Sequence, residues 1–230
     1  MEILILGALD EEIAGIRAAM AGVQDVQAGA FGVACGELHG HKIYLCRCGV
    51  GKTNAAAATA AILTKYPTVS WVINTGVAGG IGGGLQRGNV ALGTKTVHHD
   101  YDQTPDGLRK GQVQGFDSEY FEGDKEMLSL MEQALKEEEI EYRVGVIASG
   151  DQFIASDATA KRIGKEFNAI ACDFESAPIA QVCALFSKPF LSMRAISDNG
   201  GDNAVMSFYE FLHIAAANNV RAIEHFCRLL

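Results

Sequence analysis

The stretch Phe190–Asp198, FLSMRAISD, predicts a buried strand that ends on a carboxylate. Its apolar residues follow one another almost without interruption, which is typical of a strand covered on both faces in an α/β sheet. Sheets of this kind bind small molecules where their strands end. The end of this strand is therefore a candidate ligand site.

Acidic residues also follow two other predicted strands. Asp173 and Glu175 come directly after residues 169–172, and Asp10-Glu11-Glu12 follows residues 1–7. Carboxyl groups gathered at strand ends suit acid/base chemistry on a neutral or cationic substrate. We therefore predict an enzyme.

The bulk composition indicates one ordinary folded domain. The chain has 230 residues, of which 48% are hydrophobic and 20% are charged. Chains of this length and composition commonly fold as one unit, so we expect a single domain over residues 1–230. The net charge of -9 argues against nucleic acid or an anionic membrane as the main partner.

The cysteines and the N-terminal sequence predict a cytoplasmic protein. The 6 cysteines show no paired metal spacing, and Cys46 and Cys48 are one residue too close for a redox or zinc pair. Reduced, buried thiols are the favoured interpretation. Met1 leads directly into a strand, without a signal peptide or a span near the ~20 apolar residues of a membrane helix.

Strand and helix patterns alternate along the chain. The predicted strands are residues 3–6, 42–46, 71–74, 88–96, 143–148, 169–172 and 190–196, and the predicted helices are 53–65, 124–138, 158–167, 176–186 and 207–230. This order predicts an α/β fold of three layers, with a central mixed, twisted sheet flanked by helices. Residues 98–123 are expected to form a loop near the active site or at an oligomer contact.

Two glycine-containing segments resemble nucleotide-binding motifs without matching them. The segment Gly49-Val50-Gly51-Lys52-Thr53 resembles the end of a P-loop, but Cys46 stands where that motif needs glycine. The glycine-rich residues 76–84 follow a buried strand and do not open an obvious helix, as a dinucleotide fingerprint would. This run either lets a ligand approach the backbone closely or forms a flexible turn.

Simpler explanations exist for the remaining polar residues. His98, His99 and Asp100 are adjacent, so their side chains diverge at a strand end, and we predict no metal site. Glu12 and Glu175 could cap helices, and Asp198 could occupy a turn. Considered one at a time, none of these carboxylates distinguishes a catalytic role from a structural one.

Taken together, six motifs carry a resemblance to one family. They are Gly7-Ala8-Leu9-Asp10-Glu11-Glu12, Gly49-Val50-Gly51-Lys52, Asn74-Thr75-Gly76-Val77-Ala78-Gly79-Gly80, Ser149-Gly150-Asp151-Gln152-Phe153-Ile154, Asp173-Phe174-Glu175-Ser176-Ala177 and Arg194-Ala195-Ile196-Ser197-Asp198. In order and spacing, over nearly the whole chain, they resemble the bacterial 5'-methylthioadenosine/S-adenosylhomocysteine nucleosidases, which have a nucleoside phosphorylase-like fold.

The resemblance implies hydrolysis of the bond between adenine N9 and ribose C1', without a metal or an organic cofactor. Asp198 matches the general acid that protonates adenine N7, and Glu12 matches the general base that activates water. Glu175 matches the carboxylate that holds the ribose hydroxyls. A homodimer is also implied, because family members complete the pocket with a segment of the partner.

The resemblance also implies a set of substrate-binding residues. Phe153 would stack on the purine, the Ile154 backbone would bind its amino edge, and Arg194 would order water and carboxylates. The others matching this set are Val77, Ala78, Gly79, Phe174, Ser197 and Phe208, of which Phe174 and Phe208 would close around sugar and base. Val77 replaces a frequent serine and Asp173 a frequent glutamate, and backbone roles are expected to persist at both positions.

Elementary chemistry supports this interpretation. Breaking a glycosidic bond places positive charge on the ribose, which carboxylates stabilise, and the departing base needs a proton. We expect Asp198 in a drier environment than Glu12, which separates their pKa values. The first loop carries three acidic residues and no arginine before Arg17, which favours water over phosphate as nucleophile.

Other interpretations remain open at this point. A purine nucleoside phosphorylase or a nucleosidase for a futalosine-type substrate would share the fold, and a non-catalytic nucleoside-binding protein is the alternative from another class. Residues 103–110 depart from the family's apolar run. There, Asp106 and Arg109 would either pair with a homocysteine tail or belong to a solvated loop.

Overall fold

A computed structural model describes residues 1–82, 84–198 and 204–230, with the side chains of Leu212, Ile214 and 216–230 in the last segment. Within these residues, ten strands form one mixed sheet. They are β1 (Glu2–Gly7), β2 (Ala21–Ala28), β3 (Phe31–Leu38), β4 (His41–Arg47), β5 (Trp71–Gly80), β6 (Val90–His98), β7 (Tyr120–Glu122), β8 (Tyr142–Ser149), β9 (Ala169–Asp173) and β10 (Phe190–Asp198).

Part of the sheet closes on itself. The strand order is β10-β6-β8-β9-β5-β1-β4-β3-β2, with β7 beside β6, and β10 also pairs with β5. Strands β5, β9, β8, β6 and β10 therefore form a ring, while β1 to β4 extend from it. The structure confirms the predicted mixed sheet, but the sequence did not indicate closure, because each strand's apolar pattern is the same whichever neighbour it pairs with.

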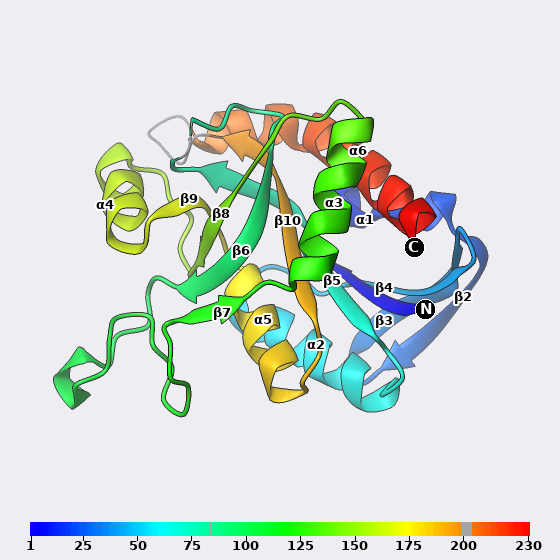
Figure 1. Ribbon diagram of the computed structural model, residues 1–230, viewed down its shortest axis with the longest axis horizontal. Coiled ribbons are helices and arrows are strands. Elements are labelled where there is room, and N and C mark those ends of the chain that lie inside the picture. The colour runs from blue at the N-terminus through cyan, green and yellow to red at the C-terminus, as the bar shows by residue number, and fades with distance from the viewer. Residues whose placement is uncertain (83, 199–203) are drawn as a thin grey trace.

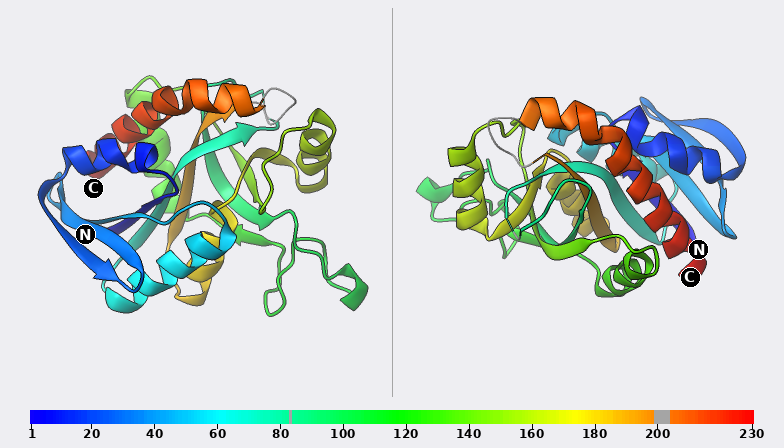
Figure 2. Two further views of the ribbon diagram at one scale, coloured as in Figure 1. Left: turned by 180° about the vertical axis from the view of Figure 1, so that it is seen from behind. Right: turned by 90° about the horizontal axis from the view of Figure 1, so that it is seen from above.

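Helices cover the sheet on both sides, as predicted (Figures 1 and 2). They are α1 (Asp10–Ala19), α2 (Lys52–Lys65), α3 (Lys125–Glu137), α4 (Asp157–Phe167), α5 (Ser176–Leu185) and α6 (Ala204–Leu229), with a short 3-10 helix at Thr104–Asp106. Helices α1, α3 and α6 lie on one side, α2 and α5 lie on the other, and α4 lies beside β8 and β9.

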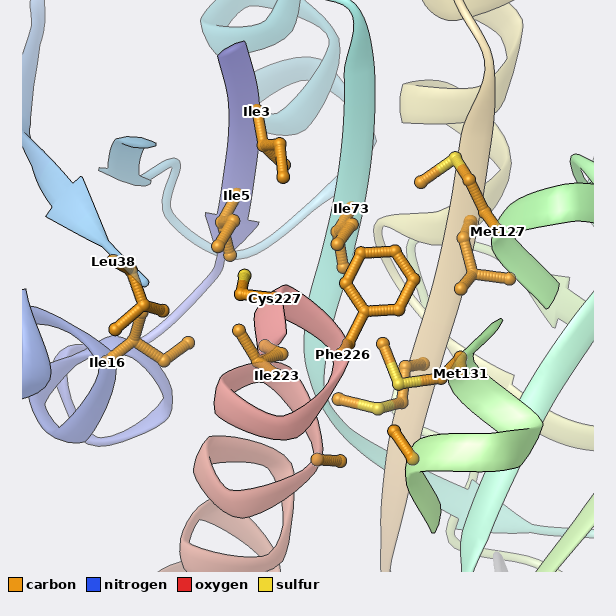
Figure 3. Packing of buried hydrophobic residues seen from close by; sticks show 14 of the residues in the cluster. Ile3, Ile5, Ile16, Leu38, Ile73, Met127, Met131, Ile223, Phe226 and Cys227 are labelled. Carbon is orange, nitrogen blue, oxygen red and sulfur yellow. The ribbon is translucent and has the colours of Figure 1, made fainter. Parts of the chain in front are cut away.

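The two faces of β1 show how alternation builds the two cores. Ile3 and Ile5 pack with α1, α3 and α6 around Phe226, as Figure 3 shows. Leu4 and Leu6 point to the opposite face and pack with α2 and α5. Successive strand residues face opposite sides of a sheet, so one continuous apolar run supplies both cores.

Some elements were absent from the sequence prediction. Strand β2 is mostly exposed and its valines are separated by polar residues, and β7 is 3 residues long, so neither has the apolar run that marks a buried strand. Strand β3 and helix α1 were also not predicted. Residues 98–123 contain β7 and the short helix as well as loop. The glycine-rich run was also partly misjudged, because β5 continues to Gly80 instead of turning after Asn74.

Among the residues described, no helix has both the length and the apolar character that crossing a bilayer requires.

Candidate active site

A cavity of about 620 Å³ lies where β1, β9 and β10 end, next to the second half of β5. Strands β1 and β10 both run parallel to β5, so their carboxyl ends meet at the same side of the sheet. Five acidic residues from three remote parts of the chain line this cavity: Glu11, Glu12, Asp173, Glu175 and Asp198. They include the three predicted catalytic residues, Glu12, Glu175 and Asp198. The convergence of these side chains is the central feature of the site.

Glu12 stands at the start of α1 and is held by backbone N–H groups. Its Oε2 accepts hydrogen bonds from Ala8 at 2.6 Å and Leu9 at 2.9 Å, and its Oε1 accepts one from Val77 at 2.9 Å. A carboxylate offers about four acceptor positions. These three backbone bonds leave Oε1 with acceptor capacity toward the cavity, where a water molecule could deliver a proton.

The two explanations considered for Glu12, helix capping and a place in the active site, therefore both hold in part, because the same carboxylate caps α1 and lines the cavity. Burial raises the pKa of Glu12, while Arg194 and the three N–H groups oppose this rise. The expected difference in exposure from Asp198 is absent: Glu12 is 2% exposed and Asp198 is 4% exposed. The two carboxyls differ instead in their hydrogen-bond partners, which the sequence does not reveal.

A buried arginine lies behind the cavity wall. The Arg194 side chain is fully buried, and its Nε lies 2.7 Å from Asp173 Oδ2 while its Nη2 lies 3.1 Å from Glu175 Oε2. Nη2 also donates to Asn74 Oδ1 at 2.5 Å. The Arg194 guanidinium therefore forms ion pairs with Asp173 and Glu175 and attracts Glu12 at longer range. When all three carboxyls are ionised, this cluster has more negative than positive charge.

Glu175 faces the cavity and does not cap the following helix. It occupies the N-cap position just before α5 but makes no side-chain cap hydrogen bond, and the Ser176 N–H donates to Asp173 instead. Glu175 Oε1 accepts from the Gly51 N–H at 3.0 Å. Burial raises the pKa of Glu175 to about 7, with Arg194 opposing the rise and Asp173 and Glu12 adding to it.

Asp198 closes β10 at the cavity. Its Oδ2 accepts a hydrogen bond from the Ser197 hydroxyl at 2.9 Å, and both residues line the cavity. Across from them, β5 contributes Val77, Ala78 and Gly79 to the wall. The register pairs Asp198 with Gly79, which brings this carboxyl next to the small residues of β5.

The remaining predicted binding residues are distributed as follows. Phe153, Ile154 and Phe174 line the cavity, and Phe153 is 43% exposed at its rim. The side chain of Phe208 lies outside the described residues. The backbone role expected at position 77 is present, because the Val77 N–H binds Glu12, whereas Asp173 acts through its side chain.

The P-loop-like segment contributes to this site in another way. Lys52 Nζ lies 2.6 Å from Asp100 Oδ1, and the Lys52 N–H donates to Asp151 Oδ1 at 2.8 Å. Asp100 Oδ2 in turn accepts from the Asp151 N–H at 2.9 Å. This Lys52–Asp100–Asp151 network joins three segments of the chain, and the segments of Lys52 and Asp151 contribute Val50 and Phe153 to the cavity wall.

Three further polar residues near the site contact other parts of the chain: His98, His99 and Arg109. His98 bonds Gln181 at 3.0 Å, and burial lowers its pKa to about 4. His99 packs against Gly150, where an added Cβ would lie 2.3 Å from His99 Nε2. Arg109 binds Glu119 at 2.6 Å, and Asp106 and Arg109 are both exposed. Their two alternative roles, pairing with a homocysteine tail or belonging to a solvated loop, stay predictions.

Comparison with known proteins agrees with this geometry. The model of the Phosphorylase superfamily matches residues 2–228. The chain is 38% identical to the 5'-methylthioadenosine/S-adenosylhomocysteine nucleosidase of Bacillus cytotoxicus over 225 residues, which are 97% of this chain and 96% of that protein. It is 36% identical to the enzyme of that name from Oceanobacillus iheyensis, with 97% of both chains covered.

The chain belongs to this nucleosidase family.

Solved structures of the nucleosidase family share the whole fold. The Neisseria meningitidis nucleosidase in complex with methylthio-immucillin-A superposes with a TM-score of 0.96 at 38% identity, covering 100% of this chain and 99% of that one. A futalosine hydrolase from Helicobacter pylori superposes with a TM-score of 0.95 at 28% identity, covering 100% and 98%. The nucleoside phosphorylase-like fold and the family resemblance of the sequence are therefore confirmed.

The roles of several residues of this family site were not found from the sequence. Asn74, Asp173 and Ser176 surround Arg194, and Leu9, Val50, Gln152 and Cys172 line the cavity. Asp173 was named from the sequence as a strand-end carboxylate, but its ion pair with Arg194 was not predicted. The roles of the other residues, among them the polar Asn74, Gln152 and Ser176, appear only once the strands are assembled.

Proposed function

We propose that this protein hydrolyses the N-glycosidic bond of 5'-methylthioadenosine and S-adenosylhomocysteine, which releases adenine and a 5-thioribose product. The observation that carries the proposal is the convergence of Glu12, Glu175 and Asp198 on one cavity. Membership of the nucleosidase family supports the substrate class. The cavity volume of about 620 Å³ lies within the usual range for small-molecule sites.

The charge of the site suits a cationic transition state. Cleavage between N9 and C1' develops positive charge on the ribose, and fixed negative groups stabilise it most where water is excluded. Glu12, Asp173 and Glu175 surround one guanidinium. The excess negative charge of this cluster favours a ribose that becomes positive as the bond breaks.

Each of the three predicted catalytic carboxyls has a separate role in the proposal. Asp198 donates a proton to adenine N7, so that the base leaves neutral. Glu12 accepts a proton from water through Oε1, and its raised pKa makes it a stronger base than an exposed glutamate. Glu175 accepts hydrogen bonds from the ribose hydroxyls, since Gly51 and Arg194 occupy one acceptor position on each of its oxygens.

The aromatic residues and small strand residues bind the nucleoside. Phe153 stacks on the purine, and the Ile154 backbone binds its amino edge. Val77, Ala78, Gly79 and Ser197 form the wall beside the base, and Phe174 and Phe208 close around the sugar. These assignments follow the family motifs, and the positions of the described cavity-lining residues support them.

Water is the proposed nucleophile. A phosphorylase needs cationic groups with free donors for its phosphate. In the described part of the chain, three cations near the carboxylates have acidic partners: Arg47 with Asp10, Lys52 with Asp100, and Arg194 with Asp173. Phosphate would therefore meet negative charge and occupied donors.

Adenine release tests this proposal. The protein is incubated with 5'-methylthioadenosine in phosphate-free buffer, and free adenine is measured by chromatography. We expect full activity without phosphate and a loss of about 10²–10⁴-fold in Asp198→Asn, which keeps the shape but holds no transferable proton. A strict phosphate requirement would assign the protein to the phosphorylases, and binding without turnover would assign it to nucleoside-binding proteins.

A futalosine-type substrate is a second candidate, favoured by the likeness to the Helicobacter pylori futalosine hydrolase. The chemistry at N9 and C1' would be the same. Comparing kcat/KM for futalosine, 5'-methylthioadenosine and S-adenosylhomocysteine in one assay ranks the three.

We also propose that the protein acts as a homodimer. The cavity rim supports this, since Val50 is 47% exposed and Phe153 is 43% exposed beside the opening. Apolar side chains at a ligand site are candidates for cover by a second subunit. Analytical ultracentrifugation at assay concentrations tests the proposal, and a monomer with full activity would contradict it.

A further inference from the structure

A buried amide side chain lies behind the peptide that binds Glu12. Asn219 stands on α6 and is fully buried, and its Nδ2 donates to the carbonyl oxygen of Gly76 at 2.7 Å. The carbonyl of Gly76 and the N–H of Val77 belong to one peptide group. The Val77 N–H points to Glu12 Oε1, the oxygen with remaining acceptor capacity, at 2.9 Å.

This arrangement links α6 to the proposed base through one rigid unit. A trans peptide is planar, so a hydrogen bond that fixes its carbonyl also fixes the direction of its N–H. No cis peptide occurs in the described chain. Gly76 has φ +148°, a conformation that L residues with side chains rarely adopt. On its carbonyl side, this peptide is held by the Asn219 amide.

We infer that Asn219 is a positioning residue for the hydrolytic reaction, which orients the Gly76–Val77 peptide so that its N–H holds the Glu12 carboxylate toward the nucleophilic water. Asn219 is not among the residues that line the cavity. Its Oδ1 is buried without a hydrogen-bond partner among the described residues. Burying the Asn219 amide oxygen without a partner lowers the stability of the folded protein. The useful contribution of this side chain is then the hydrogen bond from its Nδ2 to the Gly76 carbonyl.

The adjacent residue provides a matched control. Asn218, on the same helix, donates its Nδ2 to the Gly88 carbonyl at 3.0 Å, and Gly88 is not part of the cavity wall. Replacing either asparagine with leucine removes one side-chain bond to a glycine carbonyl. The two variants therefore separate a general loss of packing from an effect on Glu12.

The inference rests on the proposed role of Glu12, and steady-state kinetics over a pH series test both. We expect Asn219→Leu to lower kcat about tenfold, the worth of a hydrogen bond to a charged group, with little change in KM. The acidic limb of its pH profile should move to higher pH, because losing the Val77 N–H bond favours protonated Glu12. Asn218→Leu should keep the parent profile.

Two further variants keep the outcomes distinct. If Asn219→Leu does not fold, Asn219→Ser and Asn218→Ser provide the same comparison without added bulk. An Asn219 variant with the kcat and pH profile of its Asn218 counterpart would overturn the positioning role. Glu12→Gln separately tests the proposed base. If this variant stays active, the proposed role of Glu12 fails. If it is inactive and the Asn219 variant is unaffected, only the positioning role of Asn219 is refuted.

Discussion

Gly76→Ala should lower kcat, because the added methyl group would displace the proposed base. An added Cβ would lie 2.4 Å from Glu12 Oε1 and 2.4 Å from Arg194 Nη1, far inside contact distance. Both charged groups would have to move, and the 2.9 Å bond from the Val77 N–H to Glu12 would be lost or distorted. Losing one hydrogen bond to a charged group costs about 1.5–3 kcal/mol of free energy. If this whole cost is added to the activation barrier, kcat falls by about 10–100-fold.

Backbone strain adds a separate cost to folding. Alanine at a φ of +148° costs about 1–3 kcal/mol, which lowers the melting temperature by roughly 2–10 °C for a chain of this size. Gly40→Ala is the control, because Gly40 has φ +83° in the β3–β4 turn and an added Cβ would meet no atom within 4 Å. We expect it to lower the melting temperature but not kcat. Equal kcat values for Gly76→Ala and Gly40→Ala would refute the argument that close packing around Gly76 positions Glu12.

Three further predictions concern charged groups. Burial raises the pKa of Glu175 to about 7, and its ionised form accepts the ribose hydroxyls, so kcat/KM should fall as the pH drops below 7. Glu175→Gln should lose most activity and keep only the acidic limb that protonation of Glu12 causes; an unchanged acidic limb in the variant would contradict the assignment. Asp100→Asn should raise KM about tenfold with a smaller effect on kcat, because losing the ion pair with Lys52 loosens the loops around the purine. The control is Glu122→Gln, which removes the surface ion pair with Lys95. Equal KM values for the two variants would show that substrate binding does not need the Lys52–Asp100–Asp151 network. His225 lies between Glu137 at 2.6 Å and Glu138 at 2.8 Å, and hydrogen bonds to these carboxylates raise its pKa. The stability from this pairing is present below the unfolded pKa of about 6.5 and disappears as the pH rises through the raised folded value. His225→Gln should therefore lower the melting temperature at pH 6 and have little effect at pH 9, and thermal scans with equal losses at both would exclude the ion pair.

The hydrophobic pattern accounts for most of the regular elements. The seven predicted strands and five predicted helices all occur, because continuous apolar runs and helical periodicity reflect burial directly. The prediction missed β2, β3, β7 and α1 and underestimated β5. An exposed edge strand with polar residues lacks the signal, and a run of glycines indicates a turn by composition even where neighbouring strands hold it in a sheet.

The motifs were sufficient to nominate Glu12, Glu175 and Asp198, because strand ends carrying carboxylates are recognisable in a single chain. The motifs could not show which of these three carboxylates also caps a helix or stands in a turn. Glu12 caps its helix as well as lining the cavity, whereas Glu175 leaves that task to Asp173. A capping pattern is local, but the direction of a side chain depends on what packs against it.

The sequence by itself determined the order of strands and helices, the family, and the identity of the acidic groups, since all of these are encoded by neighbouring residues and their spacing. Only the tertiary structure decided the closed ring of strands, the burial of Arg194 among three carboxylates, and the contact between Asn219 and Gly76, which are 143 residues apart. The physical reason is that pKa values, hydrogen-bond partners and peptide orientation depend on distances between remote segments, and these exist only after the sheet and its covering helices have packed.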